Sequence, residues 1–507
     1  MYLPPAVSRE LARNAWAARN PYNRHAPYCD NIDGVFIADL VAQYGSPLFV
    51  FSEKTIREKA RRAKKAFQAA YPDTVFAWSY KTNYLAAVCN IFHQEGWLAE
   101  VVSDVEYDKA IKAGIHGQNI VYNGPNKSRA SLAKALHNGS VVQIDNWDEL
   151  EIIEDIVQQS GGHPARVGIR VWMENRHLPQ CWSKFGFALD NGEAKRAALR
   201  VIANPQLMLH TLHTHIGTQV LQPKAYAFAA EQLVALRQSL HQQTYSLVPC
   251  INLGGGFPSE SQWYIEPEDT KHPPIEDFAK AIASAFNRLP ETTRPQLRLE
   301  TGRHLIDEAG YLVASVVAVK GMERDKEKPI RGKFSRGRYI TDIGVHLVPN
   351  NAWYRYNVMP TKPASPLITE KVQLDGCLCM AIDVIRNEVE LPPLEVGDQL
   401  VLNPVGAYNF SQSMQFIELR PAVVLIGNGV NVIRRREELV DLDRCEQVPS
   451  YLQLDEEDDI SSLGFRSSSE LPEATPETSG LTVGAIEDGY RYKGGPKGDA
   501  NSWEKVQ

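Results

Sequence analysis

The sequence predicts an α/β protein in which a parallel (β/α)8 barrel is followed by a smaller, mostly antiparallel β domain. Between Gly34 and Glu300, short apolar strand-like runs alternate with amphipathic helical stretches. Eight such runs occur, which is the number that closes a barrel of this kind. After Ala309 the pattern changes to closely spaced strand-like runs, which predicts a separate β domain.

The eight predicted barrel strands are short apolar runs, each followed by polar or glycine-containing turns. A charged helical stretch that opens at Ser52 and continues to Ala70 precedes the first of them. The runs are residues 75–78, 98–102, 120–122, 141–144, 165–171, 207–213, 249–253 and 296–300. The strand-like runs of the second domain include 311–320, 372–374, 398–402 and 422–427.

Four segments follow from this pattern. We expect residues 1–35 to pack with the β domain, 36–308 to form the barrel and 309–445 to form the β domain. Residues 446–507 carry 13 acidic and 5 basic residues. Their low apolar content predicts a largely disordered tail, which is either a solvated appendage or a docking segment.

The composition is that of a soluble enzyme, with 507 residues, 43% of them hydrophobic and 23% charged. No apolar run approaches the roughly 20 residues of a membrane span, and residues 1–20 carry too many charges for a signal peptide, so we expect a cytoplasmic protein. The seven cysteines are scattered, unlike a disulfide framework. The net charge of -7 argues against nucleic-acid binding.

Lys81 directly follows the apolar run 74–78. Burial at the carboxyl end of a strand penalises a charged amine, so we expect its pKa to be lowered and the amine to be free for Schiff-base chemistry. A solvated lysine capping a strand is the alternative. Barrel active sites lie at the carboxyl ends of the strands, which favours the chemical interpretation.

Further polar and glycine residues follow other predicted strands or lie late in the chain. Consecutive glycines let backbone N–H groups close around a phosphate, and a histidine or carboxylate at a strand end faces the same edge of the barrel. The residues so placed are His215, Gly217, Thr218, Gly254, Gly255, Gly256, Glu300, Gly302, Arg303 and Tyr408.

The order of these motifs resembles that of the fold-type III pyridoxal phosphate (PLP) decarboxylases, the group that contains diaminopimelate, ornithine and arginine decarboxylases. The matching motifs are Tyr-Lys-x-Asn at 80–83, His-Ile-Gly-Thr at 215–218, Gly-Gly-Gly-Phe at 254–257, Glu-x-Gly-Arg at 300–303, Cys-x-x-x-Asp at 379–383 and Gly-Ala-Tyr at 406–408. Residues 123–127, 183–187 and 394–398 also match, and the resemblance covers roughly residues 34–438. It implies a PLP-binding barrel like that of alanine racemase, an amino-acid substrate and a homodimer with shared active sites.

The resemblance also implies roles for the residues. Lys81 would hold PLP, Glu300 would face the pyridine nitrogen and His215 would stack on the ring. Glu100 occupies the place of an acidic residue near the lysine, although a plain strand-end carboxylate is an equal alternative. The expected ligands of the cofactor phosphate and their neighbours are Gly217, Thr218, Gly254, Gly255, Gly256, Gly302, Arg303 and Tyr408.

Cys379 matches the family thiol that protonates the α-carbon after CO2 has left, donated by the second subunit. A buried cysteine without chemistry is the alternative. Asp383 fits an acidic residue of the family nearby. Cys377 and Cys379 could form half of a metal site, but the sequence has no second cluster with ligand spacing, so we expect no metal.

The substrate end departs from the family pattern. Met380 stands where the family has an acidic residue, and the stretch around Asn350 and Asn351 lacks an arginine that pairs with a distal carboxylate. Arg303 or Arg355 could supply that charge. We therefore expect an altered substrate, as in the decarboxylases of siderophore or other secondary metabolism. The expected substrate contacts are Arg303, Tyr354, Cys379, Asp383 and Tyr408.

Two alternatives to a decarboxylase remain. An amino-acid racemase of the same cofactor fold would need a tyrosine base in the second domain opposite the lysine, and the motif from Cys379 to Asp383 speaks against it. A non-catalytic PLP-binding protein is usually a single barrel, so the long second domain speaks against that one. Release of CO2 from an amino acid separates a decarboxylase from both.

Overall fold

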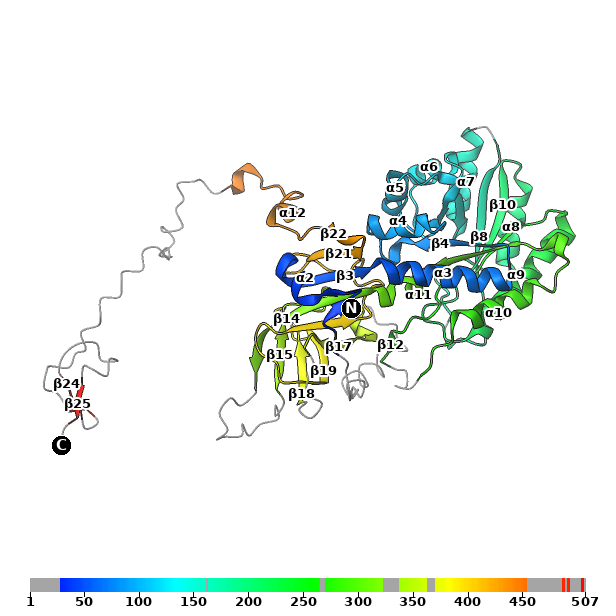
Figure 1. Ribbon diagram of the computed structural model, residues 1–507. Helices are drawn as coiled ribbons and strands as arrows, with labels where there is room; N and C mark the ends of the chain where they lie inside the picture. Colours follow the sequence, from blue (N-terminus) through cyan, green and yellow to red (C-terminus); the bar gives the residue numbers. More distant parts are fainter. Residues whose placement is uncertain are drawn as a thin grey trace. The chain divides into compact units, whose positions relative to one another are not determined.

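The structure, a computed structural model, describes residues 28–160, 163–179, 181–264, 270–321, 337–362 and 370–453, together with the backbone of three short strands between residues 486 and 505. The described residues up to Glu438 belong to one compact unit, and those from Leu439 onward belong to a second. The barrel and the β domain both belong to the first unit (Figure 1).

Eight parallel strands close into a barrel. Consecutive strands pair in parallel from β4 to β8 and from β10 to β13, β10 also pairs with β8, and β13 pairs with β4. All eight strands predicted from the sequence are confirmed. They are β4 (Thr74–Ser79), β5 (Leu98–Val101), β6 (Ile120–Tyr122), β7 (Val141–Ile144), β8 (Ala165–Trp172), β10 (Leu207–His213), β11 (Cys250–Asn252) and β13 (Gln296–Thr301).

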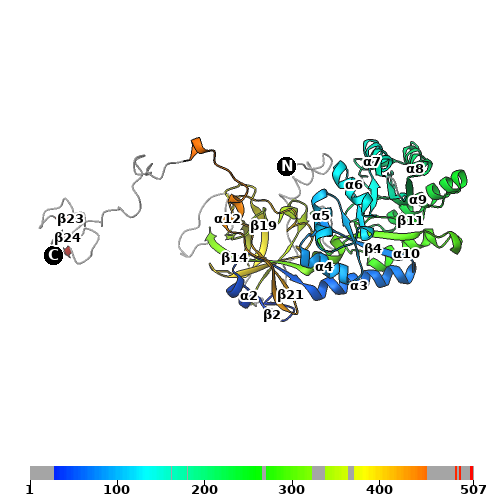
Figure 2. The same cartoon turned by 90° about the horizontal axis from the view of Figure 1, so that it is seen from above.

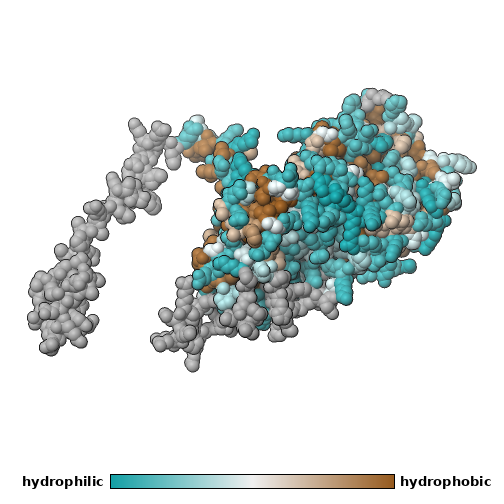
Figure 3. Space-filling model, in the orientation of Figure 1, coloured by the Kyte–Doolittle hydropathy of each residue, from teal (hydrophilic) through white to brown (hydrophobic). Residues whose placement is uncertain are grey.

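Helices surround these strands, as the view in Figure 2 shows. The predicted helical stretch after Ser52 is α3 (Glu53–Ala70), and the Ser52 side chain caps it by accepting the N–H of Thr55. Its buried residues, such as Ile56 and Phe67, recur at helical spacing, while its charged face is part of the hydrophilic surface seen in Figure 3. The other helices of the barrel are α4 (Ala86–Gln94), α5 (Asp104–Lys112), α6 (Arg129–His137), α7 (Trp147–Ser160), α8 (Glu193–Ala203), α9 (Pro223–Thr244) and α10 (Ile275–Phe286).

The β domain is built on the long strand β14 (Gly310–Lys320), which pairs antiparallel with three neighbours. The sheet is mostly antiparallel, as predicted, and its described parallel pairs are β15 with β18 and β3 with β21. Its other strands are β3 (Leu48–Ser52), β15 (Arg338–Thr341), β17 (Asn357–Pro360), β18 (Glu370–Asp375), β19 (Val384–Leu391), β20 (Gln399–Asn403), β21 (Ala422–Gly427) and β22 (Gly429–Arg434).

The strand β3 lies inside the range 36–308 that the sequence assigns to the barrel, yet it pairs between β14 and β21 of the β domain. All five of its residues are buried, and the chain passes from it directly into α3. Ahead of it, α2 (Ile37–Tyr44) packs Ile37 and Leu40 into the same apolar cluster as Val313 and Val401. The expectation that residues 1–35 pack with the β domain concerns mostly residues 1–27, which lie outside the described residues.

In the second unit, α12 (Leu439–Asp443) is followed by a small antiparallel sheet of β23 (Ile486–Glu487), β24 (Tyr490–Tyr492) and β25 (Trp503–Lys505). The acidic run 455–459 of the predicted disordered tail lies outside the described residues. Within the described part of the chain, no helix has both the length and the apolar character needed to cross a bilayer.

Candidate active site

A cavity of about 740 Å3 opens between the carboxyl ends of the barrel strands and the β domain. The strand β4 ends at Ser79, and a short 3-10 turn (Tyr80–Thr82) turns Lys81 into this cavity. Nine of the residues singled out from the sequence line it: Lys81, His215, Thr218, Gly256, Glu300, Gly302, Arg303, Tyr354 and Tyr408. Gly217, Gly254 and Gly255 adjoin them in the chain, and Glu100 lies beneath Lys81.

Glu100 faces the lysine because Ser79 and Glu100 are partners in the pairing of β4 with β5. Its Oε1 lies 3.3 Å from Lys81 Nζ and accepts a hydrogen bond of 3.0 Å from the side chain of Asn123. The Glu100 side chain is fully buried, and its Oε2 has no partner among the described residues. The alternative of a plain strand-end carboxylate is therefore less favoured than a role beside Lys81.

The pKa of Lys81 departs from the sequence prediction. Burial does act to lower it, but the charges of Glu100, Tyr408 and Glu300 outweigh burial and raise the pKa above its ordinary value. The prediction of a lowered pKa was wrong because it considered the strand end alone and not the carboxylates of two neighbouring strands. In this protein the lysine amine is held charged by its neighbours.

His215 follows β10, and its Nδ1 accepts the backbone N–H of Gly255 at 3.0 Å. Burial, with the charges of Lys81 and Arg170, lowers the pKa of His215 well below its usual value, so the ring is neutral and can accept this bond. A register shift in β10 between Leu209 and Thr211 precedes it. Such a bulge re-aims the residues that follow it.

The glycine turn 254–256 fits only residues without side chains. A Cβ at Gly255 would lie 2.1 Å from the carbonyl oxygen of Glu300, and one at Gly256 would lie 2.0 Å from that of Gly217. Gly254 and Gly256 also have φ of 64° and 90°, which favour glycine. The backbone can therefore approach a ligand closely at this turn.

Glu300 lies at the end of β13 and is 5% exposed. Its Oε1 accepts a hydrogen bond of 2.5 Å from Asn252 Nδ2, and its Oε2 lies 3.7 Å from His213 Nε2. The carboxylate thus enters the cavity at a fixed position, held from the next strand of the barrel.

Arg303 and two tyrosines form the side of the cavity next to the β domain. The Arg303 guanidinium lies 4.2 Å from the ring centre of Tyr354 and 5.1 Å from that of Tyr408, and pairs with Asp307 at 3.2 Å. Burial lowers the pKa of Arg303, but these tyrosines and Asp307 outweigh it and raise the pKa, so the guanidinium stays charged. A Cβ at Gly302 would lie 2.0 Å from Thr82 Oγ1, so this turn also packs closely.

Cys379 and Asp383 are not among the described residues that line the cavity of this chain. Cys379 is exposed. The Asp383 carboxylate accepts the backbone N–H groups of Val345 and Leu378, each at 2.7 Å, and so shapes the turn that carries the cysteine. In the part of the chain that the structure describes, no cluster of histidine, cysteine or carboxylate side chains could hold a metal ion.

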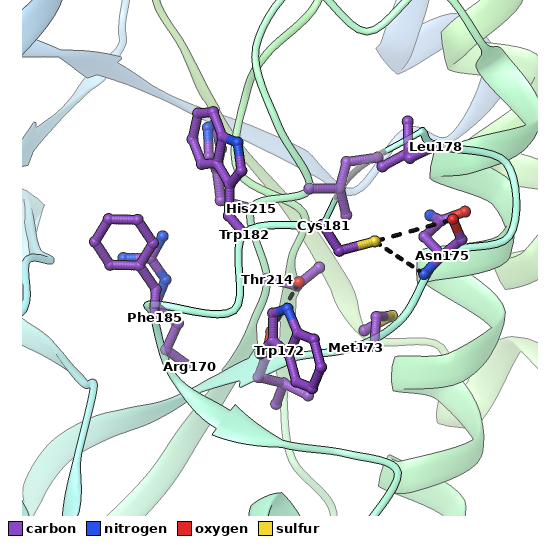
Figure 4. Close-up of a pocket in the computed structure, with 12 residues that line it drawn as sticks. Arg170, Trp172, Met173, Asn175, Leu178, Cys181, Trp182, Phe185, Thr214 and His215 are labelled. Carbon is purple, nitrogen blue, oxygen red and sulfur yellow. Dashed lines mark hydrogen bonds between the residues drawn. The ribbon is translucent and has the colours of Figure 1, made fainter. Parts of the chain in front are cut away.

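The cavity wall also contains residues to which the sequence assigned no role in the site, although Phe185 lies in the matching stretch 183–187. Arg170, Trp182, Phe185, Trp263 and Trp353 line the cavity. Figure 4 shows Trp182 beside His215, and the two ring centres are 5.6 Å apart. Alternation along β8 could have indicated Arg170, but the tryptophans lie on turns or short pairings that carry no periodic signal.

Of the two arginines considered for a distal carboxylate, Arg303 lines the cavity, whereas Arg355 is not among its lining residues. The Arg355 Nη2 donates to the backbone oxygen of Tyr264 at 2.7 Å. Asn350 lines the cavity, and its Nδ2 donates to Asn409 Oδ1 at 3.4 Å.

The chain is similar in sequence and fold to pyridoxal-dependent decarboxylases over most of its length. Residues 53–307 match the family described as pyridoxal-dependent decarboxylase, pyridoxal binding domain. The chain is 30% identical to the diaminopimelate decarboxylase of Methanothermobacter thermautotrophicus over 83% of this chain and 96% of the relative, and 29% identical to that of Bacillus subtilis over 82% and 94%. The crystal structure of the Methanocaldococcus jannaschii diaminopimelate decarboxylase superposes with a TM-score of 0.76 at 26% identity, covering 85% of this chain and 99% of that one. The predicted family and fold are confirmed.

Replacing Glu100 by Gln should lower the pKa of Lys81, because the charge that most strongly opposes burial is removed. In cofactor-free protein, the pH at which Lys81 becomes half-reactive toward an acylating reagent, followed by mass spectrometry, should move to lower pH. The exposed Glu231→Gln exchange, which affects only a surface pair with Arg288, is the control. A midpoint that stays in place or rises would contradict the electrostatic account.

Proposed function

The chain belongs to the fold-type III pyridoxal-dependent decarboxylases, and on this premise we propose that the cavity around Lys81 is where it removes CO2 from an amino acid. The observation that carries the proposal is the meeting of Lys81, Glu300 and Arg303 in one cavity beside the glycine turn 254–256. PLP is a phosphorylated pyridine aldehyde, and each of its parts needs a different partner. The aldehyde needs an amine, the pyridine nitrogen a buried carboxylate, and the phosphate a buried cation and a turn without side chains.

The residues fit PLP at both ends of the cavity. Lys81 would bind the cofactor covalently, and the free Oε2 of Glu100 beneath it offers an acceptor in a buried place. The phosphate would be held by the glycine turn 254–256, Thr218, Gly302, Arg303 and Tyr408. When bound, PLP supplies an electron sink for the electron pair that CO2 leaves behind.

The other side chains would orient and protect this chemistry. Glu300 would keep the pyridine nitrogen protonated, because a carboxylate held 5% exposed favours a positive partner. The neutral His215 would stack on the ring, and the Trp182 ring packs against His215. The aromatic residues of the cavity would limit the access of water to the reacting carbon.

We propose that the active protein is a homodimer in which Cys379 and Asp383 reach the cavity of the partner subunit. Apolar side chains are exposed near the Cys379 turn, which supports an interface there. Ile382 is 46% and Met414 48% exposed. Met414 lies near the same turn, because its N–H donates to the backbone oxygen of His346, and the neighbouring Val345 donates its N–H to Asp383. Cys379 would then donate a proton to the α-carbon. A cytoplasmic location is part of the same proposal.

We further propose that the substrate differs from that of the dedicated diaminopimelate and ornithine enzymes. Among the described residues of the cavity lining, Glu300 is the sole carboxylate, and it is assigned to the cofactor. A distal ammonium therefore lacks an acidic partner from this chain, and Met380 would bring none from the partner subunit. The Asp383 carboxylate already accepts the N–H groups of Val345 and Leu378, so it is engaged in its own turn. Trp182, Phe185, Trp263 and Trp353 instead offer apolar surface that fits a larger side chain.

The first test concerns the cofactor link. Purified protein with PLP should absorb in the visible, and borohydride should fix the cofactor on Lys81, because this amine faces the cavity. Lys81→Ala should abolish the fixed adduct, while Lys184→Ala, which changes a lysine at the same cavity, should keep it. Recovery of the adduct on another lysine by peptide mapping would refute the assignment.

The second test concerns the shared site. Lys81→Ala and Cys379→Ala proteins should each be inactive, and mixing them should restore up to about a quarter of wild-type CO2 release, since a heterodimer carries one intact site. Subunit exchange is verified with two affinity tags. Exchange without recovered activity would mean that both residues serve the same chain's cavity.

The third test is a CO2-release screen over L- and D-amino acids, including diamino acids. Meso-diaminopimelate and ornithine should be poor substrates compared with a larger or less charged amino acid. The missing bidentate contact should cost about 2 to 4 kcal/mol, or roughly 30- to 1000-fold in kcat/KM. Turnover of diaminopimelate at a kcat/KM equal to that of the best substrate would refute the altered specificity and point to Arg303, which lines the cavity, as the source of the missing charge.

A further inference from the structure

We propose that Asn252 is a positioning residue that fixes the Glu300 carboxylate and the glycine turn 254–256 relative to each other. The inference rests on the proposed function, because it takes Glu300 as the partner of the pyridine nitrogen and the turn as part of the phosphate site. One side chain would then set the spacing between the two ends of the cofactor site.

Asn252 is the last residue of β11 and is fully buried. Its Nδ2 donates to Glu300 Oε1 at 2.5 Å, and its Oδ1 accepts the N–H of Gly254 at 2.9 Å. Both ends of one amide are therefore used, one on the carboxylate and one on the turn. A reversed amide would set oxygen against carboxylate and NH2 against N–H, so chemistry fixes its orientation.

The neighbouring strands explain why this residue is so placed. In the barrel, Asn252 pairs with His213 on one side and with Arg298 on the other, and Glu300 lies two residues beyond Arg298 on the same face of β13. His213 Nε2 is 3.7 Å from the carboxylate, too far for a hydrogen bond. Among the described side chains, Asn252 is the one that donates to the Glu300 carboxylate within hydrogen-bond distance.

Exchanging Asn252 for Asp separates the two contacts. The shape is kept, and either carboxylate oxygen can still accept the Gly254 N–H. The other oxygen would face Glu300 Oε1 across a 2.5 Å contact in a buried site. Two carboxylate oxygens repel each other at this distance unless a proton lies between them. The Glu300 carboxylate must then turn away or take up a proton, and in both cases it loses its place.

A double-mutant cycle on cofactor-free protein tests the contact without any reference to catalysis. Asn252→Asp should lower the thermal unfolding midpoint by about 3 °C or more. Adding Glu300→Gln should recover at least half of that loss, because the new glutamine amide can donate to the new aspartate. Asn191→Asp is the matched control, since exposed Asn191 uses its oxygen to accept the Glu193 N–H and should show no loss. If the midpoint losses of the two single variants simply add in the double variant, the proposed contact between residues 252 and 300 is refuted.

The positioning role is tested on the PLP-loaded protein. Asn252→Asp should keep PLP affinity within roughly tenfold, change the visible absorption band as Glu300→Gln does, and lower kcat by about 10²- to 10⁴-fold with a smaller change in KM. The double variant should lose no more kcat than Glu300→Gln alone. Wild-type kcat and an unchanged spectrum in Asn252→Asp would refute the role. If borohydride fixes no cofactor on Lys81, the proposed function is refuted instead. The double-mutant cycle on cofactor-free protein would still test the contact between Asn252 and Glu300.

Discussion

The site depends on the closure of the barrel, in which β13 returns to pair with β4. This one parallel pairing sets Glu300 beside Ala77, two residues from the Ser79 that in turn pairs with Glu100. Strands that run in parallel bring all their carboxyl ends to one edge. A lysine, two carboxylates and the glycine turn, distant in sequence, therefore share a single cavity. Without this pairing β4 and β13 would be the two outermost strands of an open sheet, and Lys81 and Glu300 would lie far apart.

The sequence predicted the parts of the fold that follow from local pattern. Each of the eight barrel strands is a short apolar run with a clear boundary, and α3 begins with a serine cap, so both were identified in place. The family was identified because its motifs lie at strand ends in a fixed order. Lys81, His215 and Glu300 were singled out for the same reason, since each lies within two residues of the carboxyl end of a strand.

Features that depend on long-range contacts were missed. The pKa of Lys81 is raised by Glu100 and Glu300 from other strands, and no local pattern reports their distance. In the sequence Asn252 is an ordinary strand residue. Its proposed role depends on the Glu300 carboxylate, which β13 places beside it. The tryptophans of the cavity wall lie on turns or, for Trp263, in the two-residue strand β12 (Gln262–Trp263), and segments this short carry no periodic pattern. The strand β3 joined the β domain because its partners β14 and β21 lie far along the chain.

That position of β3 has a consequence for how the protein is made. Leu48–Ser52 leaves the ribosome before the entire barrel, whereas β14 and β21, which flank it, are synthesised after. Until then the nascent chain carries an apolar strand with both edges open, of the kind that invites wrong pairing. The β domain can be completed only after β21 has been synthesised, by which time every strand of the barrel has left the ribosome. A truncated product would expose this strand permanently and become a substrate for chaperones or proteases.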